Sequence, residues 1–459
     1  MKNNGQKKVL STLALTMISI AGIVNLRNLP IMAGVGFSAL FFYILAALFF
    51  LLPSAFVCAE LASLFPEAGG LYLWVEKAFG AKAGFFAIWS EWFNNVIGVP
   101  ATLSFIAAAV AYSFIPHLSH HKVAMFLVML VILWGSTLFN FLGIKASSRL
   151  NIIGALFGSI LPTLIITILG FVWIYSGHIA QISFSWHALV PKWHFANVAF
   201  FIGVLSGYSG MQITAFHIQN VKNPKYTFPR AIFFATILIL AITIFGSLAI
   251  GLVVPSQKLS LVSGVMDGFL GFFTAFHMTW ALYILAGLIA ISGISTLSAW
   301  LLAPARGLSV AARDGHFPRW CAHENSRGMP TNILVLQALI GTALASLFLF
   351  IPSLSEAFWL LVVLTSQFTL VMYLLVFSAA IKLRYKYSKR PNLFCMPGGN
   401  LGLWVIAGSS IIVCSLGVIL GYVPPKNLHI HKVFDYEFIV LSGNLLYVLL
   451  PLLIYRKRS

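Results

Sequence analysis

Residues 204–230 read VLSGYSGMQITAFHIQNVKNPKYTFPR. An apolar segment gives way at 206–210 to two glycines, two serines and a tyrosine, and then resumes a helical composition before a basic end. Glycine lowers the stability of a helix interior, and serine competes for backbone hydrogen bonds. Residues 206–210 therefore predict an interruption within a helix.

The composition of the whole chain places this interruption in a membrane. Of 459 residues, 60% are hydrophobic and only 8% are charged, with a mean hydropathy of +0.96. A soluble domain has about a quarter charged residues. The apolar segments are long and continuous, as membrane-crossing helices require, whereas a membrane barrel would need short alternating segments. The composition predicts an all-α membrane protein.

We expect a single polytopic domain over residues 1–459 with no cleavable signal, because the first apolar run is too long and is followed by many others. The twelve predicted transmembrane helices span roughly 9–33, 36–64, 83–115, 123–143, 151–177, 196–220, 230–254, 276–305, 331–352, 355–380, 401–422 and 438–455.

The net charge of +18 is distributed unevenly along the chain. Twenty-two of the 28 lysine and arginine residues fall in segments on one side of the predicted membrane, and Arg27 lies inside the first span. The five on the other side are Lys122, Lys192, Lys258, Lys426 and Lys432. This asymmetry follows the positive-inside rule and predicts a multi-pass protein of the plasma membrane, in bacteria the inner membrane, with both termini in the cytoplasm. The basic charge does not predict nucleic-acid binding.

A second interruption lies in the first span, where residues 18–34 read ISIAGIVNLRNLPIMAG. Asn25, Arg27, Asn28 and Pro30 fall in the middle of this apolar stretch. Polar residues and a proline at this depth predict a break in the helix, because a proline removes a backbone donor.

The two interrupted spans are the first and the sixth. This spacing is expected if residues 9–177 and 196–380 form two inverted five-helix repeats, followed by two additional helices at about 401–455. In such transporters the discontinuous helices meet near the bilayer midplane and present helix ends to the substrate. Two unrelated proline or glycine kinks are the alternative interpretation.

Four stretches carry a resemblance to a known family, and they are NLRNLPIMAGVGFSALFFY (25–43), AELASLFPEAGGLYLWVEKAFG (59–80), HIQNVKNPKYTFPRA (217–231) and LLAPARGLSVAARDGHFP (301–318). In this order they resemble the amino acid–polyamine–organocation superfamily, and within it the glutamate/GABA-antiporter-like branch. The resemblance covers the first ten spans. It implies the LeuT-like fold, a five-plus-five inverted repeat with discontinuous helices 1 and 6.

The resemblance also implies a substrate site around the two interruptions. Their free backbone groups would face the substrate, and a half-helix starting near Met211 would suit a carboxylate. The residues implied to bind substrate are Ile23, Val24, Asn25, Glu91, Asn95, Ser206, Gly207, Tyr208, Ser209, Gly210 and Trp300. This chain departs from many relatives at 23–25, which are not glycine-rich, and at Gln212, where relatives often have an acidic residue.

Arg27, Glu60, Glu91 and Gln212 are the candidates for coupling or gating. A charge at the centre of a membrane helix costs about 2.5–3.5 kcal/mol on insertion scales and marks function by default. Arg27 has two possible roles: it binds a substrate carboxylate, or it pairs with Glu60 or Glu91. We favour the pair.

The sequence thus predicts a secondary active transporter or exchanger of amino acids that works by alternating access. Glutamate/GABA antiport is suggested by the resemblance alone, and a proton-coupled symporter is the alternative. Residues 207–210 spell GxSG, as in intramembrane serine proteases, but His217 lies too far from Ser209 for direct contact on one helix. We expect no enzymatic activity. A nutrient sensor would need a signalling domain, and the sequence predicts none.

The expected partners are an amino acid or a compound derived from one, protons in the symport alternative, and the lipid bilayer. We expect no cofactor, and no oligomeric state is predicted. The four cysteines Cys58, Cys321, Cys395 and Cys414 are far apart and match no metal-ligand spacing, so we predict neither a disulfide nor a metal site. Because the sequence stops at YRKRS, we expect no C-terminal plug.

Overall fold

The computed structural model describes residues 11–65, 70–114, 121–191, 200–212, 224–350, 354–387, 394–424 and 433–455. Within these ranges all regular secondary structure is helical. The first helices in chain order are α1 (Thr12–Ile23), α2 (Leu29–Ala33), α3 (Ala39–Ala46), α4 (Leu52–Leu64), α5 (Leu71–Phe79), α6 (Ala81–Phe114), α7 (Lys122–Asn140), α8 (Ile144–Ile153), α9 (Leu161–Tyr175) and α10 (Trp186–Leu189). They are followed by α12 (Phe200–Gly207), α14 (Pro224–Val253), α15 (Gly264–Ala275), α16 (Thr279–Arg313), α17 (Thr331–Ser346), α18 (Leu354–Lys386), α19 (Gly399–Leu403), α20 (Ser409–Leu420) and α21 (Val433–Ile454).

Ten helical stretches among the described residues are long and apolar enough to cross a membrane. They correspond to ten of the twelve predicted spans. Three π-helical segments join consecutive α-helices: Ala47–Leu51 and Trp404–Gly408 lie within such stretches, and Gly154–Ile160 overlaps the start of a third. The two predicted spans that are missing from this set are 9–33 and 196–220, which are the two for which the sequence predicts an interruption.

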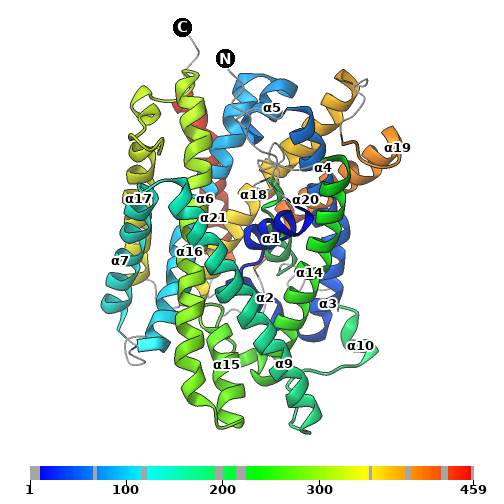
Figure 1. Cartoon of the computed structure of the whole chain (residues 1–459), viewed down its shortest axis with the longest axis vertical. Coiled ribbons are helices and arrows are strands. Elements are labelled where there is room, and N and C mark those ends of the chain that lie inside the picture. The colour runs from blue at the N-terminus through cyan, green and yellow to red at the C-terminus, as the bar shows by residue number, and fades with distance from the viewer. Residues whose placement is uncertain are drawn as a thin grey trace.

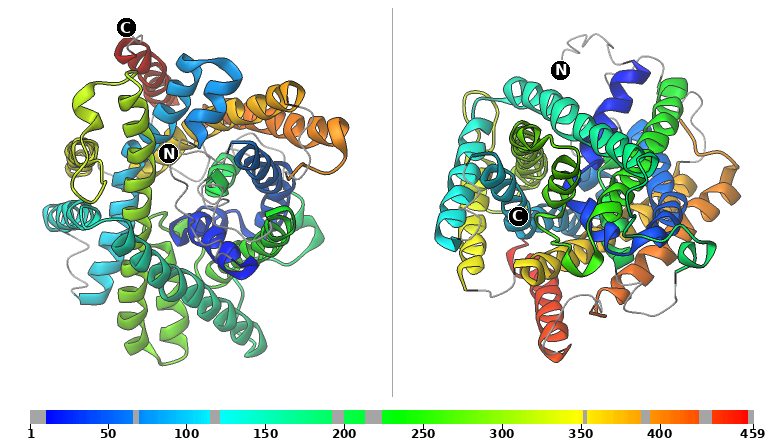
Figure 2. Two further views of the ribbon diagram at one scale, coloured as in Figure 1. Left: turned by 45° about the horizontal axis from the view of Figure 1, so that its top comes forward. Right: turned by 90° about the horizontal axis from the view of Figure 1, so that it is seen from below.

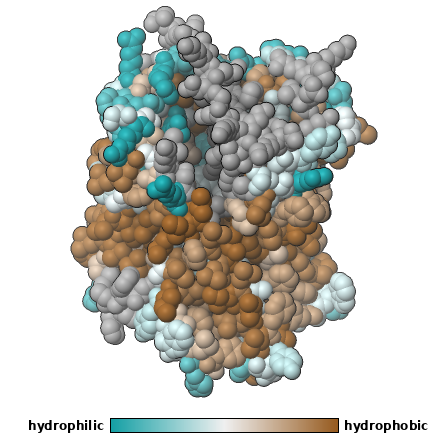
Figure 3. Space-filling model, viewed as in Figure 1, coloured by the Kyte–Doolittle hydropathy of each residue, from teal (hydrophilic) through white to brown (hydrophobic). Residues whose placement is uncertain are grey.

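A belt of hydrophobic side chains crosses the middle of the molecule, and hydrophilic residues gather mainly above it (Figure 3). Exposed large side chains such as Val131, Leu401 and Leu453 are apolar. In a soluble protein a continuous apolar surface of this size would be unusual. The chain is therefore a multi-pass membrane protein.

Helices from the two halves of the chain are interleaved. The long helix α6 packs against both α16 and α18, and α1 packs against α14. An oblique view and a view from below show blue and cyan helices lying among green, yellow and orange ones (Figure 2). Helices α5 and α19 lie toward one end of the molecule, opposite α10 and α15 (Figure 1).

The first interruption separates α1 from α2. Val24 is the last residue to donate back into α1, to the carbonyl of Ile20 at 2.8 Å. Asn25 has an extended backbone, and its side chain accepts a hydrogen bond from the backbone N–H of Arg27 to cap a short 3-10 turn. Pro30 then lies in the first turn of α2, where its missing N–H leaves no acceptor unsatisfied. Local sequence thus determines the break.

The second interruption follows α12, which ends at Gly207. Tyr208 is a turn residue, Ser209 and Gly210 are not helical, and helical geometry resumes at Met211. Gly210 has φ of +129°, and a Cβ placed there would lie 2.7 Å from the carbonyl oxygen of Gly22. Only glycine fits this position, because the two interruptions touch each other there. The structure confirms both predicted interruptions; the continuation at 213–223, which includes His217, lies outside the described residues.

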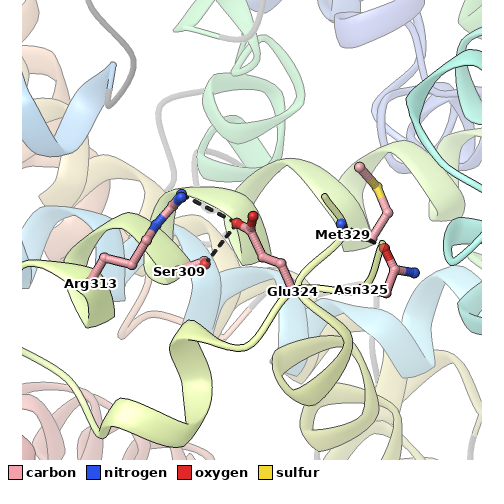
Figure 4. Close-up of polar contacts among 5 residues, drawn as sticks. All are labelled: Ser309, Arg313, Glu324, Asn325 and Met329. Atoms are coloured by element: carbon pink, nitrogen blue, oxygen red, sulfur yellow. Dashed lines mark hydrogen bonds and ion pairs between the residues drawn. The ribbon is translucent and has the colours of Figure 1, made fainter. Parts of the chain in front are cut away.

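Helix α16 is longer than predicted: it ends at Arg313, whereas the predicted span ends near residue 305. Hydropathy marks only the part that crosses hydrocarbon, whereas the helix continues into a polar end. There Arg313 forms an ion pair of 3.3 Å with Glu324, which also accepts a hydrogen bond from Ser309 (Figure 4). The Asn325 side chain accepts from the backbone of Met329 and closes the turn before α17.

Candidate functional site

A cavity of about 100 Å³ lies where the two interruptions meet three continuous helices. Its walls come from the α1–α2 break, α6, the end of α12, α16 and α18. The lining residues are Gly22, Ile23, Val24, Asn25, Arg27, Asn28, Asn94, Asn95, Gly98, Val99, Thr102, Ser206, Gly207, Ser209, Thr296, Leu297, Trp300, Leu301, Val362, Thr365 and Thr369. The wall is rich in amides and hydroxyls and holds one charged side chain, Arg27; none of its residues is a carboxylate.

Most of the residues expected to bind substrate lie in this wall, which brings together five segments of the chain. Those that line the cavity are Ile23, Val24, Asn25, Asn95, Ser206, Gly207, Ser209 and Trp300. Glu91, Tyr208 and Gly210 do not line it. The wall places the backbone of both interruptions on one polar space, which suits a small zwitterionic ligand.

Glu91 belongs instead to a buried polar network beside the cavity. Gln212 donates from Nε2 to Glu91 Oε1 at 3.2 Å. Gln212 Oε1 accepts from the Gly210 backbone N–H at 3.1 Å and from the Tyr373 hydroxyl. Glu91 and Gln212 are 5% and 2% exposed. The network links α6, the second interruption and α18, so it fixes their relative positions.

This network corrects one expectation about the second interruption. Its free backbone groups were expected to face the substrate, but the N–H of Gly210 is bonded to Gln212 and Tyr373. The N–H of Ser209 is likewise bonded to the carbonyl of Ser206 at 3.0 Å. Buried N–H groups in a protein are almost always hydrogen-bonded, and here their acceptors are neighbouring groups of the protein.

Tyr208 also points away from the cavity described above. Its hydroxyl lies 2.9 Å from Thr243 Oγ1 on α14, and its ring packs against Tyr43 with centroids 5.9 Å apart. The side chain is 1% exposed. Tyr208 therefore ties the interruption to α3 and α14.

The predicted ion pair of Arg27 with Glu60 or Glu91 is wrong. Arg27 Nη1 donates to the hydroxyl of Thr102 on α6, and its buried Nε has no hydrogen-bond partner. Glu91 is engaged by Gln212, and neither ion pair among the described residues includes Arg27. Hydropathy and spacing placed all three charges in the membrane but did not give their depth or the direction of their side chains.

Glu60 pairs with a residue that the sequence reasoning did not connect to it. Its Oε1 lies 2.7 Å from Arg384 Nε, with the two side chains 3% and 12% exposed. Glu60 Oε2 accepts from the backbone N–H of Met396 at 2.8 Å, and Arg384 Nη2 donates to the Met396 carbonyl at 3.4 Å. The pair thus joins α4, α18 and the segment before α19.

Several lining residues were missed by sequence reasoning, chiefly the threonines Thr102, Thr365 and Thr369. A signal for them was present. Thr365 and Thr369 are one turn apart on α18, and Thr102 continues the face of α6 that carries Asn95. Polar residues at helical spacing in an apolar helix predict a face turned toward a polar space. Thr102 lies seven residues from Asn95, two turns along that face.

Comparison with known proteins gives the family. The family model described as "Amino acid permease" matches residues 8–443. The chain is a member of the amino acid permease family. This permease is therefore part of the amino acid–polyamine–organocation superfamily, whose resemblance was carried by the stretches at the first, second, sixth and eighth spans. The match covers both interruptions and every lining residue of the cavity.

Three relatives match the permease over nearly all of its length. An uncharacterized transporter of Legionella pneumophila is 41% identical, over 99% of this chain and 98% of its own. The glutamate/gamma-aminobutyrate antiporter of Lactococcus lactis is 27% identical, over 98% of this chain and 90% of its own. A probable agmatine/putrescine antiporter of the same species is 24% identical, over 92% of this chain and 90% of its own.

Proposed function

We propose that the chain is a secondary active exchanger of amino acids that works by alternating access through the cavity between the two interrupted helices. The observation that carries this proposal is the contact between the interruptions. They come from segments about 180 residues apart, yet they share one polar cavity inside an apolar bundle. Non-helical backbone is tolerated at this depth only where it is buried in protein or lines a cavity. Antiport is supported by two of the three relatives, which are a glutamate/gamma-aminobutyrate antiporter and a probable agmatine/putrescine antiporter.

The proposed architecture has twelve transmembrane helices: the ten long ones and two discontinuous helices, 1 and 6, one in each five-helix inverted repeat (about 9–177 and 196–380), with two additional helices at about 401–455. The proposal is supported by the position of the interruptions, which fall in the first helix of each predicted repeat. Both termini would lie in the cytoplasm of a bacterium, because the excess of basic residues falls in the segments predicted to share their side of the membrane.

In this proposal the zwitterionic part of the substrate lies in the cavity between residues 22–25 and the lining residues Ser206, Gly207 and Ser209. Asn25 and Asn95 add neutral donors and acceptors to the cavity wall, and Trp300 on α16 adds an aromatic ring. The network of Glu91, Gln212 and Tyr373 acts as a gate or coupling element, because it joins the second interruption to α6 and α18 and must rearrange if α12 moves.

The test is counterflow in proteoliposomes, with the twenty amino acids and GABA as candidates. Replacing Gly210 by alanine introduces a Cβ at 2.7 Å from the Gly22 carbonyl, at a φ that other residues rarely adopt. Such strain costs about 1–3 kcal/mol, so exchange should fall by roughly tenfold or more. Gly135→Ala is the matched control, because a Cβ there meets nothing within 4 Å. Absence of counterflow with all candidates, or full activity of Gly210→Ala, would contradict the proposal.

A proton-coupled symporter is the second candidate, and one observation favours it. The buried carboxyl of Glu91 is hydrogen-bonded to Gln212 beside the cavity, and a carboxyl group in such a position can carry a proton. The two candidates differ in a simple experiment. A symporter accumulates labelled amino acid in empty liposomes when a pH gradient is applied, whereas an obligate exchanger needs internal substrate.

A further inference from the structure

Arg27 is a cation in the cavity wall with most of its hydrogen-bonding capacity unused. Its guanidinium carries five N–H donors in a fixed fork. Nη1 donates to Thr102, which in turn donates to the Gly98 carbonyl at 3.3 Å. Nε is buried and unpartnered. Thr102 therefore holds the guanidinium against α6, and the fork still lacks the planar acceptor that it matches best.

No carboxylate of the cavity wall neutralises this charge. The lining residues include none, and the two carboxylates that the sequence analysis proposed as partners are engaged elsewhere: Glu60 by Arg384, and Glu91 by Gln212. The remaining ion pair of the described residues, Arg313 with Glu324, lies at the far end of α16. An unpaired cation inside a membrane protein is unfavourable, and a ligand of opposite charge removes that cost.

A zwitterionic amino acid brings no net charge into the cavity and leaves this imbalance in place. An amino acid with a second carboxylate brings one negative charge. Arginine binds a carboxylate through two parallel N–H···O bonds, which add geometry to attraction. Because Arg27 lies two residues beyond Asn25, it is offset along the chain from the 22–25 backbone that would hold the α-amino and α-carboxylate groups.

We propose that Arg27 is a specificity-determining residue that selects amino acids with an anionic side chain. This inference rests on the proposed function, because it assigns the substrate class of the same cavity. The α-groups bind at the interruptions, and the side-chain carboxylate receives the guanidinium that Thr102 orients. Neutral amino acids of the same size leave the guanidinium unpaired and are transported less well.

Glutamate and glutamine provide the sharpest comparison, because they have nearly the same shape and differ in charge at pH 7. The experiment measures counterflow of each, and the thermal midpoint of the purified protein with each, in chloride-free buffer. The wild type should prefer glutamate over glutamine by roughly 10- to 100-fold, the range expected for a hydrogen-bonded charge. Aspartate and asparagine form a second pair that tests the reach of Arg27.

Arg27→Gln should remove this preference, so that the ratio of glutamate to glutamine exchange falls by roughly the same factor while glutamine is still exchanged. Arg27→Lys should keep part of the preference, because the charge remains but the bidentate fork is lost. Thr102→Val should lower it less than Arg27→Gln does. Arg313→Gln removes one positive charge outside the cavity and is the matched control, with an unchanged ratio.

The outcomes separate the two proposals. No counterflow of any amino acid by the wild type overturns the proposed function and this inference with it. Exchange with equal use of glutamate and glutamine, or an unchanged ratio in Arg27→Gln, overturns the inference alone. If chloride restores glutamine exchange to the level of glutamate, the cation binds a free anion and the inference is also overturned. If Arg27→Gln does not fold, Arg27→Lys and the wild-type thermal midpoints provide the test. A lower glutamate-to-glutamine ratio in Arg27→Lys, with a wild-type midpoint raised more by glutamate than by glutamine, supports the inference. An unchanged ratio and equal midpoints overturn it.

Discussion

Arg384, near the end of α18 beyond the predicted span 355–380, and Arg27, inside the first predicted span, are both arginines of the helical bundle, but their surroundings differ. Arg384 lies 2.7 Å from Glu60, and the two side chains together hold both backbone groups of Met396. Arg27 contacts a neutral hydroxyl, and its Nε has no partner. The first arginine is neutralised by the protein itself. The second faces a cavity without a carboxylate in its wall.

The difference separates a structural charge from a functional one. Removing one partner of a buried ion pair leaves the other charge uncompensated in a low dielectric. Removing a cation that has no carboxylate partner leaves no opposite charge uncompensated. Glu60 and Arg384 should therefore affect stability with any substrate, whereas Arg27 should affect the choice of substrate. The sequence alone does not make this distinction, because no local pattern shows which of these charged side chains meet in the folded chain.

The largest effect is expected at the structural pair. Arg384→Met leaves Glu60, 3% exposed, without a counter-ion and should destabilise the protein by about 3–5 kcal/mol. The measurement is the thermal midpoint in detergent together with the yield of monodisperse protein. The double variant Glu60→Gln with Arg384→Met should recover part of the loss. If Arg384→Met were as stable as the wild type, Glu60 would not depend on Arg384 for its neutralisation.

A smaller effect of opposite sign is expected at Arg27. Arg27→Met removes an unpaired cation, so the thermal midpoint without substrate should stay the same or rise, by on the order of 1 kcal/mol of stability. Glutamate should no longer raise the midpoint of this variant. A loss as large as that of Arg384→Met would show that Arg27 has a structural partner, and the comparison between the two arginines would fail.

The smallest effect is expected at the exposed pair between Arg313 and Glu324, whose side chains are 52% and 29% exposed. Ion pairs at the surface contribute about 0–1 kcal/mol. Arg313→Gln should therefore change the thermal midpoint little, and less still at high salt, where exposed charges are screened. This variant calibrates the other two, since it removes the same charge from a solvated position. A loss comparable to that of Arg384→Met would contradict the assignment by burial.

The interruptions show how far sequence reasoning reaches. Asn25, Pro30 and Gly210 change the conformation of the backbone at their own positions, so the residue type alone predicts their effect. Both breaks lie where the sequence predicts them. The ion-pair prediction failed because a pair depends on which faces of two distant helices meet, and no local pattern encodes that. Glu60 lies 324 residues from Arg384, and only packing of α4 against α18 brings them together.

By itself the sequence determined the membrane class, the approximate positions of the spans and the two places where a helix stops. These features follow from hydrophobicity, charge and backbone chemistry, which act within a few residues. Only the tertiary structure decided that Gly210 touches Gly22, that Gln212 and Tyr373 take up the N–H of Gly210, and that Arg27 is left without a carboxylate. Those outcomes depend on the rotation of each helix about its axis, which is set by packing across the whole bundle.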